Sequence, residues 1–425
     1  MNSCKERAAE FLEKHGMLPT LTDPEAISDL IYEDMKAGLG DSPKDLPMIP
    51  TYLRLEGEIK EGDRAIVIDA GGTNLRTCLV SFDGCRFMFT DIVKSPMPGT
   101  EGKISFDDFI GILADRIEHL CAYTDLIGFC FSFPATITPE KDGRVILFDK
   151  QVEIEGAEGK LLGESLNNAL AKRGIESKKI VVLNDTAATL LGGAATEDRN
   201  AYSGFIGHIA GTGVNTCCMI PVDRIPKLHS EEKYKILINN ESGFFRNVPI
   251  GDFDKLMDSY SLDPGTSLFE KMISGAYLGT DALLTLKGAA QEGYFGEKMC
   301  RYLASVESSN SAFPDNFCRG IVPEGLENEK EDFEFAQHVC FALFERSARL
   351  MCASLLATVR LTGEGTDPSK PVLVLAEGSM AQKSLCYIDF LRRKLKEYSK
   401  GYSIELKVVS DTNLIGSAAA VIFNS

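Results

Sequence analysis

A glycine-rich turn between two apolar segments limits most strongly what this chain can fold into. Residues 65–69 form a short apolar run ending in Asp69, Gly71 and Gly72 follow, and residues 75–82 are again rich in strand-forming side chains. Glycine reaches backbone conformations closed to other residues and lets the main chain approach a ligand closely. The pattern therefore predicts two antiparallel strands joined by a turn whose N–H groups can bind an anion. A plain hairpin with a polar tip is the alternative.

The segment Gly211-Thr212-Gly213 is a second turn of this type, between strands predicted at 203–209 and 215–219. Each turn starts its own series of predicted strands and helices, which favours two similar α/β lobes around a cleft. Two unrelated hairpins explain the pattern equally well. If the lobes face each other, the two turns can hold one polyphosphate between them.

The rest of the chain alternates predicted strands with helices. A helix is predicted from Pro24, capped by Thr22 or Asp23, to the glycines near Gly38. Charged residues interrupt the apolar pattern of 335–361, so that segment is predicted to be a long buried helix and not a membrane span. Another helix is predicted at 105–121, and further strands are predicted at 86–93, 127–133, 180–184, 234–238, 372–376 and 404–409.

Composition narrows the possible partners. The length of 425 residues exceeds what one hydrophobic core usually supports, so two domains are expected. The formal net charge of −17 argues against nucleic acid as a partner, because a nucleic-acid-binding protein requires a basic face. The same negative charge repels a bare polyphosphate, so such a ligand is expected to bind together with Mg²⁺. Twelve cysteines without a Cys-x-x-Cys motif, and an N-terminus without an apolar core, favour a cytoplasmic protein with buried reduced thiols and no membrane partner.

The polar side chains of the first turn suit a phosphate. The N–H groups of Gly71 and Gly72 can point at the ligand, and Thr73, Asn74 and Arg76 add donors. Asp69 ends the preceding strand, where it can hold Mg²⁺ through water. The sequence lacks the Gly-Lys-Ser/Thr of a P-loop and the fingerprint of a dinucleotide site.

Three carboxylates are candidates for binding or deprotonating a substrate hydroxyl. Asp185 follows the apolar run 180–183, and a carboxylate at a strand end can take a proton from an attacking hydroxyl. The alternative is that Asp185 only caps the helix that follows. Glu241 and Glu270 can accept hydrogen bonds from sugar hydroxyls, although most glutamates are solvated surface residues.

Seven segments, taken together, show that the chain resembles the hexokinase family from about residue 47 to the C-terminus. They match the family in its own order, and the segment around Phe269–Gly275 is the most specific of them. The matching segments are 48–52, 69–76, 131–134, 184–186, 211–215, 264–275 and 376–379.

The resemblance implies an actin-like (ribonuclease H-like) α/β fold with two lobes around a cleft. The small lobe would comprise 54–183, completed by 412–425, and the large lobe 1–53 and 184–411. It implies ATP-dependent phosphorylation of a hexose, with glucose the first expectation, at its 6-hydroxyl, as at the entry to glycolysis. Asp185 would be the general base and Arg76 would lie near the transferring phosphate. The implied sugar ligands are Ser132, Lys150, Asn184, Asn215, Glu241 and Glu270. The implied nucleotide contacts are Asp69, Gly72, Thr73, Asn74, Thr212, Gly378 and Ser379, with Mg-ATP as the nucleotide.

The chain departs from the family pattern at three places. Asp149 stands where the family has a threonine of its sugar loop, and Ser242 stands where it has a tryptophan. The family's Gly-Lys-Gly segment is replaced by 413–416. Sites that hydrogen-bond hydroxyls discriminate steeply, so these changes bear on which hexose is used.

Two other functions are compatible with the pattern. A sugar or nucleotide sensor of the same fold would bind its ligand without turnover, although Asn184-Asp185-Thr186 is intact. An actin-like or chaperone-type ATPase would hydrolyse ATP without sugar and would not need Glu241 or Glu270. The pattern predicts no oligomeric state.

Overall fold

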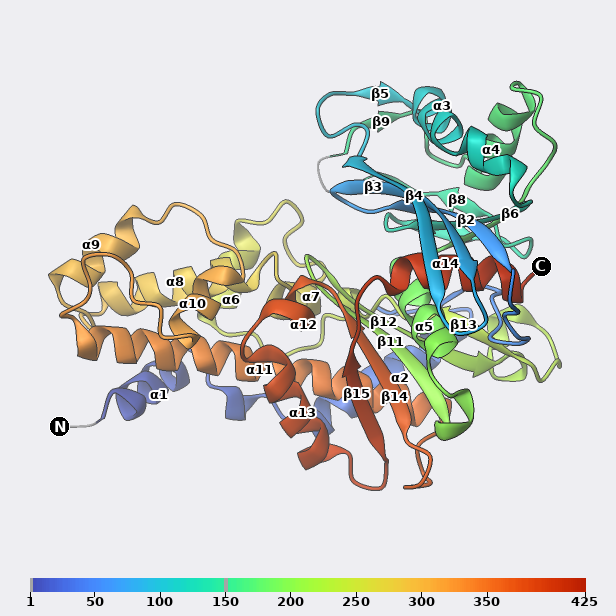
Figure 1. Cartoon of the computed structure of the whole chain (residues 1–425). Coiled ribbons are helices and arrows are strands. Elements are labelled where there is room, and N and C mark those ends of the chain that lie inside the picture. Colours follow the sequence, from blue (N-terminus) through green and yellow to red (C-terminus); the bar gives the residue numbers. More distant parts are fainter. Residues whose placement is uncertain (1–2, 149–151) are drawn as a thin grey trace.

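The computed structural model describes residues 3–148 and 152–425 as two lobes, each built on one mixed sheet (Figure 1). Lys150, predicted to bind the sugar, and Asp149 lie outside the described residues. The α/β fold with two similar lobes is therefore as predicted from the two glycine turns.

The small-lobe sheet has five strands in the order β10-β6-β2-β3-β4. Strands β2, β3 and β4 form an antiparallel meander, and β6 and β10 add to β2 in parallel. The strand bounds are β2 Arg64–Ala70, β3 Asn74–Phe82, β4 Phe87–Pro96, β6 Leu126–Phe131 and β10 Lys179–Leu183.

The large-lobe sheet repeats this arrangement in the order β13-β12-β11-β14-β15, with β1 added at the edge beyond β13. Strands β11, β12 and β13 are antiparallel, and β14 and β15 add to β11 in parallel. The bounds are β1 Ile49–Pro50, β11 Gly204–Ala210, β12 Val214–Pro221, β13 Lys235–Asn239, β14 Val372–Glu377 and β15 Ile404–Val408. The predicted duplication is confirmed, because the two sheets share one strand order and each glycine turn joins the corresponding pair of strands, β2 with β3 and β11 with β12.

Two helices lie between the sheets, α5 (Asp185–Thr196) and α14 (Thr412–Phe423). Helix α14 packs on β2 and β6, α5 packs on β11, and the inward faces of both sheets complete one buried cluster. The helices touch at glycines: a Cβ atom built on Gly416 would lie 1.8 Å from the carbonyl oxygen of Ala188. Only glycine allows the backbones to come this close.

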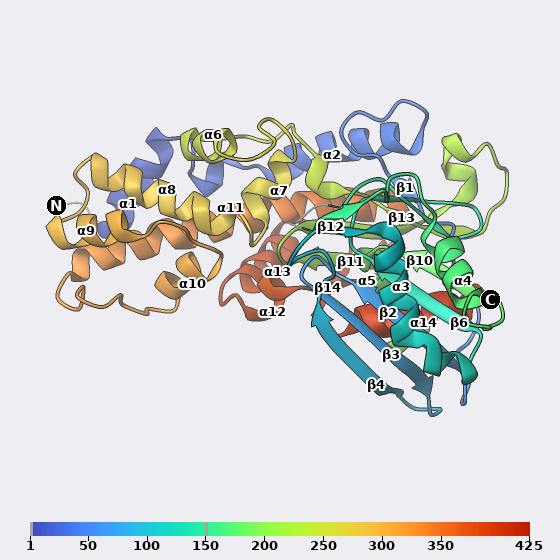
Figure 2. The same ribbon diagram turned by 90° about the horizontal axis from the view of Figure 1, so that it is seen from above.

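The outer face of the small sheet is covered by α3 (Phe106–Ile117) and α4 (Leu162–Ala171), as Figure 2 shows from above. Ser105 caps α3 by accepting a hydrogen bond from the N–H of Asp108. The predicted helix 105–121 is therefore correct at its start. It ends earlier as an α-helix, because Glu118–Ala122 continues as a 3₁₀ turn.

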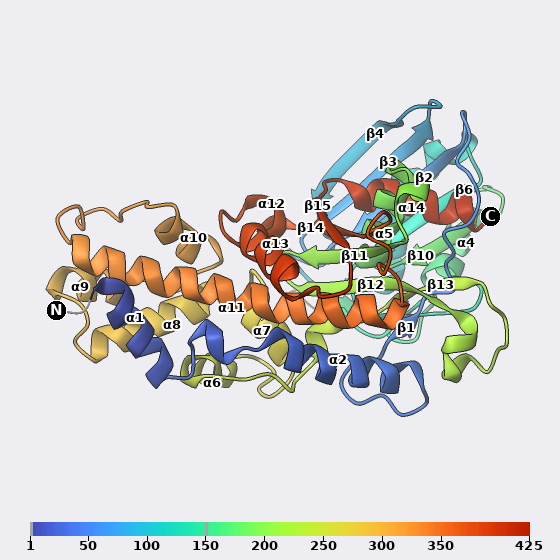
Figure 3. The same cartoon turned by 90° about the horizontal axis from the view of Figure 1, so that it is seen from below.

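Helix α11 (Lys330–Thr362) runs along the large lobe, with α1 (Cys4–Lys14) and α2 (Pro24–Leu39) beside it (Figure 3). Asp23 caps α2, and Pro24 is its first residue, as predicted. Helix α11 starts five residues before the predicted 335, at Lys330. In the described part of the chain no helix is both long and apolar enough to cross a bilayer.

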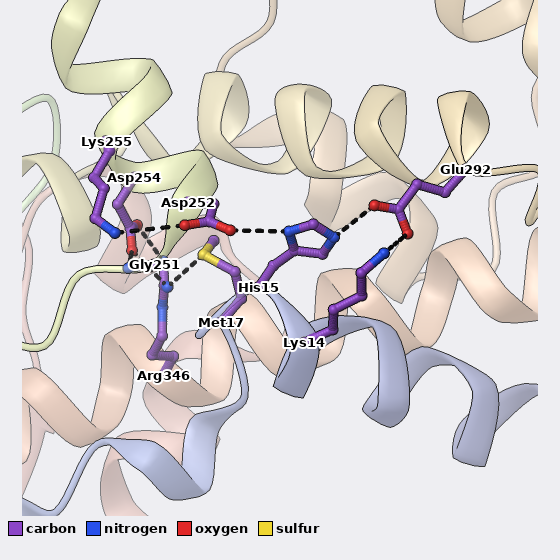
Figure 4. Close-up of polar contacts among 9 residues, drawn as sticks. All are labelled: Lys14, His15, Met17, Gly251, Asp252, Asp254, Lys255, Glu292 and Arg346. Atoms are coloured by element: carbon purple, nitrogen blue, oxygen red, sulfur yellow. Dashed lines mark hydrogen bonds and ion pairs between the residues drawn. The ribbon is translucent and has the colours of Figure 1, made fainter.

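A buried ion network fixes α11 against its neighbours (Figure 4). The Arg346 guanidinium donates two hydrogen bonds to Asp254, at 2.6 and 2.9 Å, and one to Asp281 at 2.9 Å. Beside it the ring of His15 lies between Asp252 and Glu292, at 3.1 and 2.9 Å. Removing one member of such a buried group leaves an uncompensated charge, so the network specifies how these helices pack.

The remaining elements complete the two lobes. The short strands are β5 Ile104–Ser105, β7 Ala135–Ile137, β8 Gly143–Val145 and β9 Ile154–Glu155. The other helices are α6 Asp252–Ser259, α7 Leu268–Ile273, α8 Leu278–Gln291, α9 Glu297–Ser305, α10 Ala312–Cys318, α12 Ser379–Lys383 and α13 Tyr387–Tyr398. Single 3₁₀ turns occur at Pro19–Leu21, Arg199–Ala201, Val222–Arg224, Pro226–Leu228 and Ser242–Phe244.

Candidate active site

The predicted catalytic residues lie at the carboxyl ends of the parallel strands β2, β6 and β10. Asp69 of β2 pairs with Cys130 of β6, and Cys130 pairs with Leu183 of β10. Ser132 directly follows β6, and its N–H donates to the carbonyl of Ala70 at 3.1 Å. Asn184 and Asp185 directly follow β10, so the sheet brings all four predicted residues to one edge.

Asp185 is not the residue that caps α5. The side chain of Asn184 accepts a hydrogen bond from the N–H of Thr186 at 2.9 Å, so Asn184 is the N-cap. The hydroxyl of Thr186 lies 3.3 Å from a carboxylate oxygen of Asp185. The alternative in which Asp185 serves only as a cap is therefore wrong. As the first residue of α5, Asp185 lies at the helix end that stabilises negative charge.

Arg76 forms ion pairs with two aspartates that lie far apart in the sequence. Its guanidinium lies 2.6 Å from Asp69 and 3.2 Å from Asp411. Burial raises the pKa of Asp69, the Arg76 charge opposes this, and the charge of Asp185 raises the pKa further. Asp69, Arg76 and Asp185 therefore interact electrostatically in one site, where an arginine can stabilise a phosphate.

The first turn opens into a pocket of about 510 Å³. Gly72, Thr73 and Asn74 line it, as the prediction requires of a phosphate turn. Sequence reasoning missed the other lining residues, Lys94, Ser95, Pro96 and Thr100. Lys94 lies directly opposite Arg76 in the β3–β4 register, so the turn carries two cations in an acidic protein. Lys94 directly follows the strand predicted at 86–93, and no local pattern placed it beside the turn.

The second turn lies against the segment that follows β14. A Cβ atom on Gly211 would lie 3.6 Å from both Gly378 Cα and the Ser379 nitrogen. The carbonyl of Gly211 accepts a hydrogen bond from the Gly275 N–H at 2.8 Å, and that of Thr212 accepts one from Ala276 at 3.2 Å. The residues predicted to contact the nucleotide from the large lobe, Gly211, Thr212, Gly213, Gly378 and Ser379, thus belong to one backbone cluster.

The predicted sugar ligands of the large lobe are joined by hydrogen bonds. The side-chain amide of Asn215 donates to Asn239 at 2.7 Å, and Asn239 donates in turn to Glu241. Glu270 accepts from the N–H of Val214 at 3.0 Å, next to Asn215 in the chain. Asn215, Glu241 and Glu270 therefore come together, held by Asn239, which the sequence analysis did not single out.

Ser242, in the position where the family has a tryptophan, is buried directly behind these ligands. Its N–H donates to the side-chain oxygen of Asn215 at 3.2 Å. Its hydroxyl has no hydrogen-bond partner among the described residues. A small side chain therefore lies behind the predicted sugar ligands where the family pattern has a large aromatic one.

Glu377, at the end of β14, is a further buried carboxylate that sequence reasoning missed. It accepts hydrogen bonds from the hydroxyls of Thr412 and Thr189. Burial raises its pKa to about 7, the charges of Asp411 and Asp185 raise it as well, and Arg76 opposes them. Glu377 therefore belongs to the same charge cluster as Asp69, on the large-lobe side.

The variant Glu377→Gln is expected to remove a pH dependence of stability. A carboxyl whose pKa is about 7 in the folded state and 4.5 when unfolded keeps its proton longer in the folded state. The free energy of unfolding of the native protein then falls as pH rises from about 4.5 to 7, by about 2–3 kcal/mol for this group. Urea unfolding at pH 5 and pH 8 measures this loss, which the variant should lack.

The exposed Glu158→Gln is the matched control, because its side chain lies in solvent. It should retain the pH dependence of the native protein. An equal pH dependence in Glu377→Gln and in the native protein would contradict the assignment to Glu377.

The acidic residues of the site fit a cation held through water better than one bound directly. Among the described residues no group of three or more His, Cys, Asp or Glu is placed to hold a metal ion. Arg76 already occupies one carboxylate oxygen of Asp69. A Mg²⁺ ion typically keeps several waters and is bound by one or two carboxylates together with substrate phosphates. The donor set is therefore compatible with the predicted indirect role of Asp69.

Comparisons with known proteins match nearly the whole chain to proteins of one family. Two sequence models described as hexokinase match residues 16–195 and 205–423. Hexokinase-1 of Schizosaccharomyces pombe is 29% identical over 440 residues, which cover 96% of this chain and 88% of that protein. The chloroplastic hexokinase-2 of Nicotiana tabacum is 28% identical over 439 residues, covering 94% of this chain and 87% of that protein.

Solved structures show the same fold. The Schistosoma mansoni hexokinase complexed with glucose superposes with a TM-score of 0.79 at 22% identity, covering 98% of both chains. A ROK family glucokinase from Streptomyces griseus, in complex with glucose and AMPPNP, gives a TM-score of 0.53 at 16% identity, covering 84% of this chain and 99% of that chain. Because the two hexokinase models together match most of the chain, and the solved hexokinase has the same fold, the protein belongs to the hexokinase family.

Proposed function

We propose that the protein transfers the γ-phosphate of Mg-ATP to the 6-hydroxyl of a hexose, with glucose as the first expected substrate. The observation that carries the proposal is the position of Asp185. Its carboxylate lies at the sheet edge shared with Ser132 and Asn184, and it interacts electrostatically with Asp69 and Glu377 of the charge cluster. A base between sugar ligands and phosphate ligands is what transfer to a hydroxyl requires.

The sugar is bound by the hydrogen-bonded group of the large lobe. The carboxylates of Glu241 and Glu270 accept hydrogen bonds from its hydroxyls, the side-chain amide of Asn215 can both donate and accept, and Ser132 adds a contact from the small lobe. Asp185 orients the 6-hydroxyl and takes its proton as the oxygen attacks the γ-phosphorus. The bond from that phosphorus to the bridging oxygen of ADP breaks as the new bond forms.

The phosphates are bound from both lobes. Gly71–Asn74 hold them from the small lobe, and Gly211–Gly213 with Gly378 and Ser379 hold the nucleotide from the large lobe. Arg76 stabilises the charge that develops on the transferring group. Asp69 would hold a Mg²⁺ ion through water, and the ion would supply positive charge opposite the phosphates of the nucleotide.

Lobe movement completes the site in this proposal. The moving bodies are residues 54–183 with 412–425, and residues 1–53 with 184–411. Closure on the sugar brings Ser132 towards the large-lobe ligands and excludes water, so that the γ-phosphate is transferred to the sugar and not to water. The close contact of α5 with α14 supports the choice of these two helices as the connection between the bodies.

The choice of hexose depends on the departures from the family pattern. Ser242 leaves a polar, smaller side chain behind Asn215 than the tryptophan expected there. Such a change alters the packing behind a ligand and thus the discrimination between sugars. We propose a cytoplasmic enzyme that acts on a small sugar and Mg-ATP, with neither nucleic acid nor membrane as partner.

A panel of sugars tests the function. Glucose, mannose, fructose, glucosamine and N-acetylated forms are incubated with protein and Mg-ATP, and ADP release is measured in a coupled assay. Sugar-dependent ADP release with at least one hexose is expected. ATP hydrolysis that does not depend on sugar would favour a simple ATPase. Thermal stabilisation by sugar without turnover would favour a sensor.

A further inference from the structure

The pocket at the first glycine turn contains a cation to which the proposed function gives no role. Lys94 lies on β4, the outermost strand of the small-lobe sheet (Figure 2), and its side chain is exposed. Together with Gly72, Thr73 and Asn74 it lines the pocket of about 510 Å³ that opens from the turn. Lys94 is the one charged residue among the described residues that line this pocket.

The register of the sheet places Lys94 in a row with two residues of the charge cluster. Arg76 of β3 lies opposite Asp69 of β2 on one side and opposite Lys94 of β4 on the other. Residues directly opposite each other in antiparallel strands have their side chains on the same face, with Cβ atoms about 4.5–5.5 Å apart. Asp69, Arg76 and Lys94 therefore follow one another across one face of the sheet.

Backbone hydrogen bonds hold the end of β4 beside the turn. The N–H of Met97, which directly follows β4, donates to the carbonyl of Thr73 at 3.0 Å. The N–H of Gly71, predicted to point at a ligand, donates instead to the carbonyl of Asn74 at 3.0 Å and closes the turn. One donor predicted for the phosphates is therefore used inside the protein, so side chains near the turn contribute more of the binding.

The two cations of the row differ in what balances their charge. The guanidinium of Arg76 is paired with the carboxylates of Asp69 and Asp411, at 2.6 and 3.2 Å. Within residues 3–148 and 152–425, the ammonium of Lys94 forms neither an ion pair nor a hydrogen bond. The chain has a formal net charge of −17, which opposes the approach of a polyphosphate. A cation without a carboxylate partner in this pocket therefore favours an anionic ligand.

We propose that Lys94 is a further nucleotide-binding residue that holds the non-transferred phosphates of Mg-ATP from β4, an inference that rests on the proposed function. In that function Arg76 lies at the transferring phosphate. Neighbouring strands are about 4.8 Å apart, so Lys94 lies one strand farther than Arg76 from Asp185, which follows β10 at the other edge of the sheet. A polyphosphate whose last phosphate meets Arg76 then meets Lys94 with the phosphates before it. An ammonium group with three donors suits their oxygens.

A lysine on an edge strand also has a structural use, because its charge discourages pairing with the edge of another sheet. That use requires only a charge that faces solvent, and it does not require the pocket that Lys94 shares with the turn. The two explanations differ in a property that can be measured. A lysine that only protects the edge has no effect on nucleotide affinity, whereas a phosphate ligand does.

The expected kinetic effect of Lys94→Gln is on the KM for ATP and not on kcat. The non-transferred phosphates bind alike in the ground state and the transition state, and loss of such uniform binding raises KM alone. Because the charge is exposed, the KM for ATP should rise by about 5-fold, at the upper end of what an exposed ion pair contributes. Lys94→Arg keeps the charge and should restore most of the affinity.

Binding measured without turnover tests the assignment directly. ADP and a non-hydrolysable ATP analogue, each with Mg²⁺, are titrated by calorimetry into the full-length native protein and into Lys94→Gln. The dissociation constants of both nucleotides should rise by the same factor of about 5, because both carry phosphates proposed to contact Lys94. A higher salt concentration should reduce the difference between the variant and the native protein, because salt screens exposed charges.

Lys172→Gln is the matched control, because Lys172 is an exposed lysine of the same lobe, directly after α4, and does not line the pocket. It should bind both nucleotides as the native protein does. The proposal is wrong if Lys94→Gln binds both nucleotides like this control, if only the ATP analogue loses affinity, or if Lys94→Arg binds as weakly as Lys94→Gln. A native protein that binds ADP but transfers no phosphate would overturn the proposed function and leave the binding test valid. Phosphate transfer with native affinity in Lys94→Gln would overturn this inference alone.

Discussion

Replacing Asp185 with asparagine is expected to lower turnover by about 10²–10⁴-fold, the usual contribution of a general base. The amide keeps the size of the side chain and its contact with Thr186, but it cannot take the proton of the 6-hydroxyl. Sugar affinity should change little, because Asn215, Glu241 and Glu270 remain. The measurement is kcat for the best hexose of the panel, together with the sugar dissociation constant by titration calorimetry.

Asp198→Asn is the matched control for this substitution. Asp198 is exposed, and its side chain accepts a hydrogen bond from the N–H of Asn200 at 3.0 Å, which asparagine can also accept. This variant should retain the native turnover. If Asp185→Asn keeps near-native kcat, Asp185 is not the base. If it loses sugar binding as well, its role is in binding rather than proton transfer.

Replacing Gly416 with alanine is expected to lower the free energy of unfolding by about 3 kcal/mol or more. The new Cβ would lie 1.8 Å from the carbonyl oxygen of Ala188 and 2.8 Å from its Cα, both of them backbone atoms of α5. Overpacking of this kind costs about 1–3 kcal/mol where side chains can adjust, and more where backbones must separate. Urea unfolding followed by circular dichroism measures the change.

The same substitution at Gly111 has the opposite expected sign. Gly111 lies inside α3, and a Cβ there meets no atom within 4 Å. Alanine favours a helix over glycine by about 1 kcal/mol, so Gly111→Ala should be more stable than the native protein. Equal stability of Gly416→Ala and the native protein would show that α5 and α14 are not closely packed in solution.

Local patterns made most of the fold predictable. Strand β2, which precedes the turn at Gly71 and Gly72, is buried on both faces of its sheet, and a nearly continuous apolar run reveals such a strand. Capping residues, a proline and glycines marked α2 in the same way. The short strands β5 and β7–β9 were not predicted, because two or three residues carry no periodicity of their own.

The parts of the site that were missed depend on contacts distant in sequence. Arg76 and Asp411 are 335 residues apart, and no local pattern relates them. Glu377 directly follows the strand predicted at 372–376, and its position in the sequence gives no signal of its burial beside Thr412. Lys94 was likewise hidden, because β4 extends beyond the predicted strand end at 93.

For Asp185 the sequence predicted the position correctly but left two roles open. The sequence placed it at the end of a strand and left open whether it caps a helix or does chemistry. The structure excludes the cap, because Asn184 takes it, and the chemical role of Asp185 stays a prediction. Either of two adjacent polar residues before a helix can be its N-cap. Which of them caps the helix depends on the backbone conformation, which the sequence does not reveal.

The repeated strand order has a consequence for how tightly a nucleotide can be held. Each lobe contributes one glycine turn, between β2 and β3 or between β11 and β12, so a single lobe offers only half of the proposed phosphate ligands. Two separate half-size chains would have to meet before they could bind, and their affinity would depend on their concentration. Joining both halves in one chain fixes the effective concentration of the second turn near the first. Nucleotide affinity is then a property of each molecule and does not change on dilution.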